Sequence, residues 1–481
     1  MKKIYLIFLS LILGIYFLTR LFQITTNPPS LYWDEASIGY NAYSILTTGQ
    51  DEWGTRFPIH FRAFGEFKLP VFIYTVAIFE FFLGLTELAV RLPAVIYGCG
   101  VIILTYLIGK KLFSEKVGIL SSLILTVMPW YFLISRVGYE ANAGLMFFLL
   151  GLYLWLVYDK KTWLLLISVI SFVLSMYSYN SFRVVVPLTS LYLLIFQKNW
   201  KNITKKTAEI WIFCGLILIG SLAQIVKFTL STSGTNRLGT IGIFNGDWTE
   251  ILNNFAKNYL LHFSLDFLFI KGDINLRSHI GYGGELSWVF LPFLILGIWY
   301  LIKKRQFLPL YLILISIIPA ALTRESPHAL RTISLVPFLA IMIGSGIVYL
   351  GQHLRKWEKY YYLIICVVIF IPFCFYLKSF TVEYPSKSAK EWQYSYKQIF
   401  SKGSAKFNDY DHVIISDAGA QPYIIGLFYL KYDPNQFRKT VSYNPPNKWG
   451  FSTVEKFDKY IFLNPSKVVL PKGKNLIYEY E

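Results

Sequence analysis

The chain has 481 residues, of which 55% are hydrophobic and only 15% are charged, with a formal net charge of +18. A soluble globular domain carries about 25% charged residues, and the apolar residues here come in long blocks, so the composition excludes an ordinary soluble protein and indicates a polytopic membrane protein. No run of Lys and Arg with interleaved aromatic residues occurs in a polar segment, which excludes nucleic acid as an expected partner.

Eleven apolar blocks have about the length that a membrane-spanning helix needs, roughly 20 residues. We expect the first block to be an uncleaved helix, because no small-residue cleavage site follows it. A further block at 69–86 contains Glu80 and is ambiguous. The expected crossings are 4–22, 91–109, 117–135, 141–158, 162–179, 184–197, 208–227, 287–302, 306–322, 332–350 and 360–377.

The distribution of lysine and arginine decides how the block at 69–86 is interpreted. If this block does not cross, the basic clusters between the crossings all face the cytoplasm, as the positive-inside rule requires. If it crosses, every later loop inverts. We therefore expect 69–86 to form a re-entrant or juxtamembrane helix on the outer side. The chain is then an integral membrane protein, expected in a bacterial cell membrane, with a cytoplasmic N-terminus and an extracytoplasmic C-terminus.

Three polar regions share the outer face in this topology. Two are loops, 23–90 and 228–286, of a transmembrane domain that covers 1–377. The third is the tail 378–481, which is long enough to fold alone as a small extracytoplasmic α/β domain. The fold class is therefore an all-α polytopic membrane protein of about 11 transmembrane helices with a C-terminal α/β domain. The tail is expected to contain a strand at 412–416, a helix or buried strand at 422–430, and late strands at 467–470 and 476–480.

The first outer loop contains the sequence WDEASIGYNAYSILTTG. Asp34 and Glu35 stand where a helix is expected to begin, and Gly49 is expected to end it. Adjacent carboxylates on a helix point about 100° apart, so one can face a cavity while the other caps the helix. Asp34 is either a helix-start carboxylate that interacts with the helix dipole or a catalytic group. Glu35 is the second catalytic candidate.

Further ionisable residues lie at the expected outer membrane surface, where such residues are functional candidates by default. Lys68 precedes Pro70 by two residues and either snorkels or neutralises a lipid phosphate. The segment TRESPHALR holds more basic and titratable residues than a short outer loop needs, which favours an anion-binding role over a solvated loop. The candidates for substrate binding are Glu66, Lys68, Arg136, Glu140, Arg277, Arg324, His328 and Arg331.

The order of these motifs resembles the GT-C membrane glycosyltransferases, and in particular the group of protein O-mannosyltransferases and lipid A aminoarabinose transferases. The resemblance rests on DE at 34–35, GEFKLP at 65–70, RLPA at 91–94, and SR followed by Glu140 before a helix. It implies a polyprenyl-phosphate-sugar donor, an extracytoplasmic active site and an acidic catalyst, which by matched position is Asp34. It also implies that Lys68 contacts the donor phosphate. Glu140 falls where the aminoarabinose group has an aspartate.

The expected reaction is sugar transfer from a polyprenyl-phosphate donor to a hydroxyl of a lipid, protein or glycan acceptor. It needs a base for this hydroxyl, Asp34, and fixed positive charge for the departing phosphate. No metal-spaced His pair or nucleotide-binding glycine loop is present, and all four cysteines lie in apolar blocks. We expect no cofactor beyond a possible loosely bound divalent cation. Two alternatives remain: a lipid or sugar transporter or flippase, and a glycan ligase or polymerase that uses lipid-linked oligosaccharide.

Overall fold

The computed structural model of the protein describes residues 3–64, 66–158, 161–196, 205–231, 239, 241–445, 452–463 and 470–480. The chain forms two compact units. We call the first the helical unit; it consists of Met1–Phe22, Ala94–Leu230 and Ile241–Val382. The second, the α/β unit, consists of Gln23–Pro93, Ser231–Thr240 and Glu383–Glu481. Each unit is described by itself.

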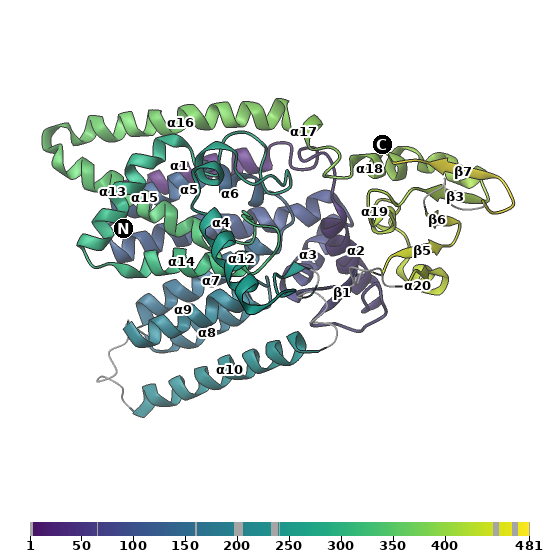
Figure 1. Ribbon diagram of the computed structural model, residues 1–481, viewed down its shortest axis with the longest axis horizontal. Helices are drawn as coiled ribbons and strands as arrows, with labels where there is room; N and C mark the ends of the chain where they lie inside the picture. Colours follow the sequence, from purple (N-terminus) through teal and green to yellow (C-terminus); the bar gives the residue numbers. More distant parts are fainter. Residues whose placement is uncertain are drawn as a thin grey trace. The chain divides into compact units, whose positions relative to one another are not determined.

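Long apolar helices build the helical unit, and α16 lies along one edge of the bundle (Figure 1). Proline at position 129 interrupts one apolar stretch and divides it into α5 and α6. The elements are α1 (Lys3–Leu21), α4 (Glu87–Leu112, whose first turns belong to the α/β unit), α5 (Glu115–Val127), α6 (Pro129–Ile134), α7 (Ala141–Val157), α8 (Trp163–Met176), α9 (Phe182–Phe196), α10 (Lys205–Thr229), α12 (Trp248–Leu261), η3 (Asp266–Ile270), η4 (Trp288–Phe290), α13 (Leu291–Lys303), α14 (Phe307–Ala321), η5 (Ile333–Leu335), α15 (Val336–His353), η6 (Arg355–Trp357) and α16 (Glu358–Val382).

Each of the eleven expected crossings coincides with one of these helices, or with the pair α5 and α6. Among the described residues, five helices are long and apolar enough to cross a membrane, and six further apolar helices are shorter. The mostly helical membrane architecture is therefore confirmed. The number of crossings and their orientation stay predictions.

Close backbone contact fixes the centre of the helical unit, where α15 is buried along most of its length. A Cβ atom at Gly297 of α13 would lie 2.1 Å from the carbonyl oxygen of Met342 on α15, and one at Gly346 of α15 would lie 2.1 Å from the carbonyl oxygen of Phe293. Only glycine fits at these two positions. Small residues give membrane helices the close packing that a lipid environment does not otherwise drive.

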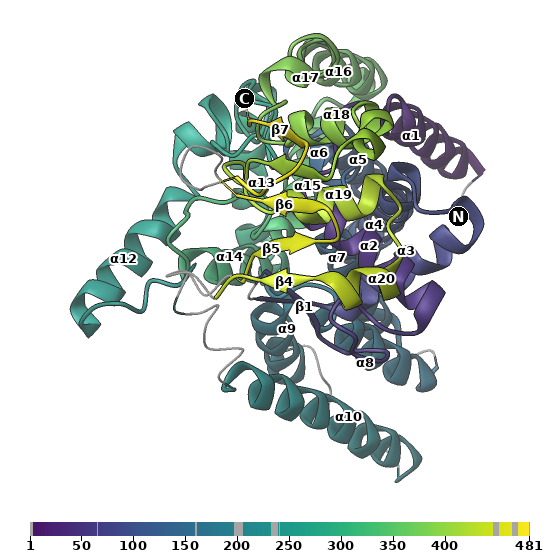
Figure 2. The ribbon, with the colours of Figure 1, turned by 90° about the vertical axis from the view of Figure 1, so that its right-hand side faces the viewer.

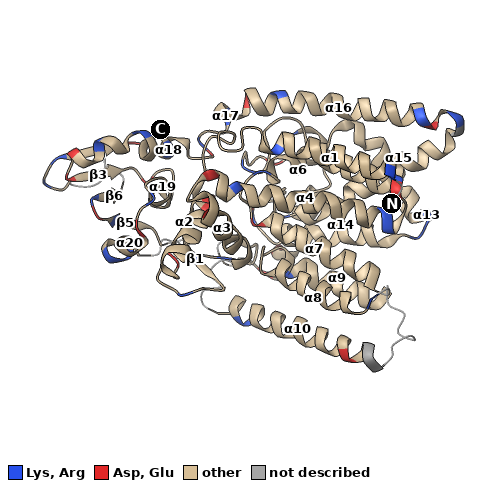
Figure 3. Cartoon of the chain, turned by 180° about the vertical axis from the view of Figure 1, so that it is seen from behind, with Lys and Arg blue, Asp and Glu red and all other residues tan. Residues whose placement is uncertain are grey.

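One end of the helical unit is strongly basic (Figure 3). Lys110 pairs with Glu115 at 2.6 Å, and Lys116 pairs with Glu358 at 2.5 Å, so the end of α4 and the starts of α5 and α16 lie together. Phe113 packs against Tyr300, which adds the end of α13. The basic residues at these helix ends are Lys110, Lys111, Lys116, Lys303, Lys304, Arg305, Lys356 and Lys359.

The loops at the other end of the helical unit contact one another. Arg136 contacts the C-terminal end of α1 through the carbonyl of Phe22. The hydroxyl of Tyr139 donates to the carbonyl of Arg277 at 2.8 Å, and the indole N–H of Trp130 donates to the carbonyl of Ala329 at 3.0 Å. The basic clusters and these polar loops therefore lie at opposite ends of the bundle, as the charge pattern predicts.

The α/β unit combines a sheet with helices from both parts of the chain. The five strands follow the order β4-β5-β6-β3-β7, with β3 parallel to both of its neighbours; four of them are labelled in Figure 2. The elements are α2 (Trp33–Thr48), β1 (Phe61–Ala63), β2 (Glu66–Lys68), α3 (Pro70–Leu83), α17 (Tyr384–Lys387), α18 (Tyr394–Lys402), η7 (Ser404–Asp409), β3 (His412–Ile415), α19 (Pro422–Tyr429), α20 (Pro434–Thr440), β4 (Ser442–Tyr443), β5 (Val454–Phe457), β6 (Tyr460–Phe462) and β7 (Asn475–Tyr478).

The predictions for the tail agree with these elements. The strand expected at 412–416 is β3, the segment 422–430 forms the helix α19, and the last expected strand contains most of β7. The segment expected as a strand at 467–470 lies, except for its last residue, outside the described residues. The small sheet is therefore confirmed.

The division of the chain differs from the domains expected from sequence. Residues 23–93 belong with the tail rather than with the transmembrane helices. The helix expected at 69–86 is α3, and it packs on α2 within the α/β unit. Phe81 and Phe82 leave 73% and 75% of their surface exposed. Exposed aromatic residues of this size suit a helix that lies at a lipid surface, as we predicted for this segment.

Cysteine labelling in cells can test which side of the membrane each end of the helical unit faces. The chain used has its four cysteines replaced by alanine. Ile274 is 93% exposed at the loop end, and Lys304 is exposed at the basic end. A membrane-impermeant maleimide should label Ile274→Cys in intact cells and Lys304→Cys only after permeabilisation. The reverse pattern would invert the predicted topology.

Candidate functional site

The first turn of α2 carries both neighbouring carboxylates of the first outer loop. α2 begins at Trp33 and ends before Gly49, whose φ of +70° is the left-handed conformation that favours glycine after a helix. Both boundaries confirm the prediction. Asp34 and Glu35 leave the helix in different directions and have different partners, as the turn of about 100° per residue requires.

Glu35 forms a fully buried ion pair with Arg91. The Nε and NH2 atoms of Arg91 each lie 3.1 Å from one carboxylate oxygen, and neither side chain is exposed. The same guanidinium donates to the carbonyls of Ile24, Pro28 and Ser30 at 2.6–3.0 Å. All five guanidinium N–H groups are thus used. The fold accounts for Glu35, and this geometry gives no support to its predicted catalytic role.

Asp34 instead pairs with Lys68. The Nζ atom of Lys68 donates to Oδ1 of Asp34. Only 4% of the lysine side chain is exposed, whereas 25% of the aspartate side chain is. A buried ammonium needs an opposite charge, and the partly exposed carboxylate supplies it. The structure therefore brings together the predicted catalytic carboxylate and the predicted phosphate-binding lysine.

A short hairpin and a helix start position Lys68. β1 and β2 pair antiparallel with Phe61 opposite Lys68, and α3 begins two residues later at Pro70, a favourable residue for the first turn of a helix. The side chain of Glu66 in β2 lies outside the described residues. Its predicted role in substrate binding stays a prediction.

Side chains that sequence reasoning missed hold the loop before α2. Lys397 Nζ lies 2.8 Å from a carboxylate oxygen of Glu87 and 2.9 Å from the carbonyl oxygen of Pro29. The hydroxyl of Tyr429 donates to Glu87 and lies 3.3 Å from the hydroxyl of Ser30. These side chains come from α4, α18 and α19. No local signal points to such contacts, because the partners are more than 300 residues apart.

The tail also caps α2. Tyr32 precedes the helix without a capping side chain, and the Oε1 atom of Gln393 accepts a hydrogen bond from the Trp33 N–H at 2.9 Å. The Nε2 atom of Gln393 donates to the carbonyl of Ala420 at 2.7 Å. A helix start leaves N–H groups that need external acceptors. Gln393 therefore fixes the helix turn that carries Asp34.

Glu52 links α2 to α19 through two hydrogen bonds. Its Oε1 accepts from the hydroxyl of Tyr423 at 2.9 Å, and its Oε2 accepts from the amide of Asn41 at 3.0 Å. The side chain is buried, and this burial raises the pKa of Glu52 to about 8. The carboxyl is therefore largely protonated near neutral pH.

The helical unit places Arg136 and Glu140 around helix ends. Arg136 is fully buried and donates to the carbonyls of Thr19 and Phe22 at 3.1 and 2.7 Å. It also lies over the ring of Phe380 at 4.5 Å. Carbonyls at a helix C-terminus need such donors, so the structure accounts for Arg136 without a ligand. Glu140 is half-buried and directly precedes α7.

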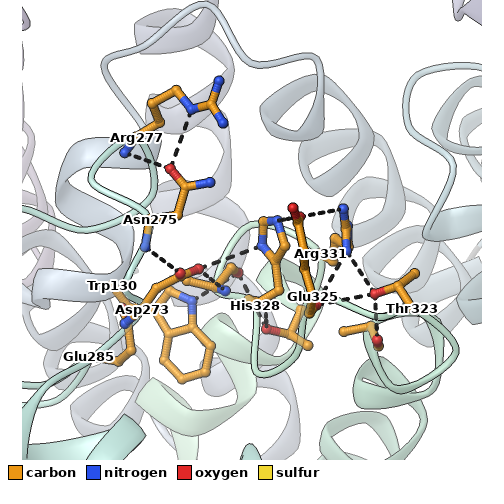
Figure 4. Close-up of polar contacts among 12 residues, drawn as sticks. Trp130, Asp273, Asn275, Arg277, Glu285, Thr323, Glu325, His328 and Arg331 are labelled. Carbon is orange, nitrogen blue, oxygen red and sulfur yellow. Dashed lines mark hydrogen bonds and ion pairs between the residues drawn. The ribbon is translucent and has the colours of Figure 1, made fainter. Parts of the chain in front are cut away.

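A polar cluster lies in the loops at the non-basic end of the helical unit (Figure 4). Nη2 of Arg331 lies 3.2 Å from Oε2 of Glu325, and its Nη1 donates to the hydroxyl of Thr323 at 2.7 Å. Arg324 is exposed, and its Nε donates to the carbonyl of Gly242 at 3.0 Å. Arg331 is therefore paired with a carboxylate, and the anion-binding role of both arginines stays a prediction.

His328 lies in the same cluster but adds no positive charge. Burial, with the nearby Arg331, His262 and Arg277, lowers the pKa of His328 well below 6.5. The imidazole is therefore neutral at physiological pH. His328 was predicted to be one of the basic or titratable residues of an anion site, because its burial is not visible in the sequence.

Within the described residues, no three His, Cys, Asp or Glu side chains are placed to hold a metal ion. The expectation of a loosely bound divalent cation stays untested.

The predicted site residues fall into two groups. Asp34, Glu35 and Lys68 lie in the α/β unit, and Arg136, Glu140, Arg277, Arg324, His328 and Arg331 lie in the helical unit.

Comparison with known proteins confirms the resemblance to the GT-C glycosyltransferases. The model of the family described as dolichyl-phosphate-mannose-protein mannosyltransferase matches residues 68–224. No curated protein matches the chain. The partial family match supports the class without naming a substrate for this chain.

Solved structures share the fold. ArnT from Cupriavidus metallidurans in the apo state superposes with a TM-score of 0.53 and 10% identity, over 89% of this chain and 84% of that chain. The apo oligosaccharyltransferase of Archaeoglobus fulgidus gives a TM-score of 0.54 and 12% identity, over 89% of this chain and 64% of that chain. The protein therefore has the GT-C fold and is an integral membrane protein.

The buried Glu35–Arg91 pair predicts a large loss of stability on Glu35→Gln. This change leaves the guanidinium buried without its counter-charge, which costs about 3–5 kcal/mol of unfolding free energy. Thermal unfolding in detergent should show a lowered transition. Glu391→Gln, an exposed glutamate of the same unit, should unfold like the parent. A Glu35→Gln protein as stable as the parent would contradict the role assigned to this pair.

The raised pKa of Glu52 predicts that the stability of the folded chain depends on pH. Between its usual pKa of 4.5 and the folded pKa of about 8, the unfolded chain loses this proton while the folded chain keeps it. The folded state therefore loses stability as pH rises through this window. Glu52→Gln should flatten the fall of the unfolding temperature, whereas Glu391→Gln should keep the parent slope. Equal slopes in the parent and Glu52→Gln would show that Glu52 ionises normally in the folded chain.

Proposed function

We propose that the protein is a membrane glycosyltransferase that moves a sugar from a polyprenyl-phosphate-linked donor to an acceptor hydroxyl on the extracytoplasmic face. The GT-C fold and the partial match to a mannosyltransferase family support the class. The single observation that carries the mechanism is the pair of Asp34 and Lys68.

The two side chains have complementary roles in the proposed reaction. Asp34 takes the proton of the acceptor hydroxyl as its oxygen bonds to the anomeric carbon of the sugar. The bond between that carbon and the phosphate oxygen breaks, and the electron pair leaves with the phosphate. Lys68 neutralises the phosphate as it departs. When Lys68 turns to the phosphate, Asp34 loses its counter-ion and becomes a better base.

The difference between Asp34 and Glu35 supports this assignment. Glu35 is fully buried, and each of its oxygens accepts a hydrogen bond from Arg91, so both oxygens are already occupied. Asp34 keeps a quarter of its side-chain surface exposed. A general base must reach its substrate, and of these two neighbours only Asp34 has exposed surface.

Arg324 and Arg331 belong to the helical unit. We expect them to contact an anionic group of the substrate. The acceptor is a lipid, a protein or a glycan. AglB of Archaeoglobus fulgidus, which shares the fold at a TM-score of 0.53, has been solved with an inhibitory peptide and a dolichol-phosphate. A lipid phosphate of this kind is the donor chemistry proposed for this chain.

Substitutions at Asp34 and Lys68 test the mechanism in purified protein supplied with polyprenyl-phosphate sugars. Asp34→Asn keeps the shape but cannot take a proton, so transfer should fall by about 10²–10⁴-fold. Lys68→Ala removes a charge-assisted contact worth about 1.5–3 kcal/mol, so kcat/KM should fall about 10- to 150-fold, and Lys68→Arg should recover part of it. Product formation by mass spectrometry is the measurement.

Asp433→Asn is the matched control for Asp34→Asn. Asp433 starts α20 in the same unit and accepts from the N–H of Gln436 at 2.7 Å, and asparagine caps a helix about as well. It should keep parent activity. If Asp34→Asn also keeps it, Asp34 is only a helix-start residue and the mechanism fails. Lipid movement without product would favour the transporter, and use of only oligosaccharide donors would favour the ligase.

A further inference from the structure

His328 lies between two carboxylates at the non-basic end of the helical unit. Figure 4 shows its imidazole between Asp273 and Glu325. Nδ1 lies 3.6 Å from Oδ2 of Asp273, and Nε2 lies 4.0 Å from Oε2 of Glu325. The two carboxylates differ, because Asp273 is 3% exposed and Glu325 is 73% exposed. One ring nitrogen thus faces a buried carboxylate, and the other faces an exposed carboxylate.

The interior carboxylate is held in place by the backbone. Oδ1 of Asp273 accepts from the N–H of Asn275 at 2.9 Å, and Oδ2 accepts from the N–H of Ala329 at 2.8 Å. The N–H of Asp273 donates to the buried Glu285 at 2.9 Å. A carboxylate with both oxygens engaged cannot rotate freely. Asp273 therefore presents a fixed acceptor oxygen to the imidazole.

A fixed oxygen on one side selects one form of a neutral imidazole. Among the described residues, no group forms a hydrogen bond with the buried Nδ1 of His328, and Oδ2 of Asp273 lies 3.6 Å from it. Placing the ring proton on Nδ1 directs it to this oxygen, whereas placing it on Nε2 would set two lone pairs against each other. Glu325 acts more weakly on the ring, because its oxygen lies 4.0 Å from Nε2 and its side chain is 73% exposed and screened by solvent. The Nε2 lone pair is then available on the side of the ring that faces Glu325.

The surroundings of Nε2 suit a carbohydrate that carries a phosphate. A neutral nitrogen with a lone pair accepts a hydrogen bond from a hydroxyl group and has no charge with which to bind phosphate. The guanidinium of Arg331 supplies positive charge in the same cluster. It is paired with Glu325 at 3.2 Å, and a phosphate can take the place of this carboxylate because Glu325 is 73% exposed. The neutral and charged groups of the cluster thus match the two chemical parts of a sugar phosphate.

We propose that His328, held in one tautomer by the positioning residue Asp273, accepts a hydrogen bond from a carbohydrate hydroxyl of the substrate through Nε2. This inference rests on the proposed function, because it takes the ligand to be a glycosyltransferase substrate. The hydroxyl belongs either to the donor sugar or to a sugar acceptor. Neither source changes the role of His328 or of Asp273.

The tautomer is measured first, in the full chain with ¹⁵N-labelled histidine and without turnover. The parent should show His328 with a protonated Nδ1 and an unprotonated Nε2, identified by the signals that vanish in His328→Gln. Asp273→Asn should mix the two tautomers. A parent spectrum with the proton on Nε2 would overturn the proposal whether or not any variant folds. His353→Gln, at the far end of α15, is the matched control and should leave the His328 signals unchanged.

Ligand binding is measured by titrating the same sample with α-D-mannose 1-phosphate and with methyl α-D-mannoside, chosen after the matched family description. A shift of the Nε2 signal with the phosphate compound alone supports the donor sugar, and equal shifts with both support a sugar acceptor. His328→Leu should raise the Kd about five- to tenfold, and His328→Gln, which keeps an acceptor, should raise it less. No shift with either compound overturns the proposal. A parent chain that shows these shifts but transfers no sugar would contradict the proposed function and leave the binding role of His328 standing.

Discussion

The ion pair of Glu35 and Arg91 is the interaction on which the candidate catalytic region depends. One guanidinium neutralises the carboxylate and donates to three carbonyls of residues 24–30, so a single side chain fixes both the loop that enters α2 and the first turn of α2. A buried charge of this kind is tolerated only when every donor is used, and here every donor is. The orientation of Asp34 follows, because it is the residue immediately before Glu35 on the same turn.

The buried pair also explains why two adjacent acidic residues have different partners and different roles. Neighbouring positions on a helix diverge by about 100°, so a turn that fixes one carboxylate in the interior directs the other elsewhere. Asp34 meets the ammonium of Lys68 and keeps some exposed surface. Residues of the tail complete the arrangement: Gln393 caps the turn, and Lys397 holds Pro29. A flexible loop would not place a base with the accuracy that proton transfer needs.

Local signals in the sequence predicted α2, β3 and the apolar helices, because helix starts, glycine ends and apolar runs are set by near neighbours. The contacts of Glu52 with Tyr423, and of Glu87 with Tyr429, depend on chain segments more than 300 residues apart and leave no local trace. The protonation state of His328 was also beyond prediction, because it depends on burial. Asp34 and Lys68 were recognised as separate motifs, and only the structure shows their contact.

The helical unit places a charged and a neutral group together in a way that suits a ligand with two kinds of polar group. A phosphate is recognised by positive charge, which Arg331 carries in this unit. Sugar hydroxyls are recognised by directional hydrogen bonds rather than by charge. A protonated imidazole cannot accept such a hydrogen bond. Burial keeps His328 neutral, and Asp273 turns that neutrality into a directed acceptor. The surroundings of His328 thus suit it to accept a hydrogen bond from a carbohydrate hydroxyl.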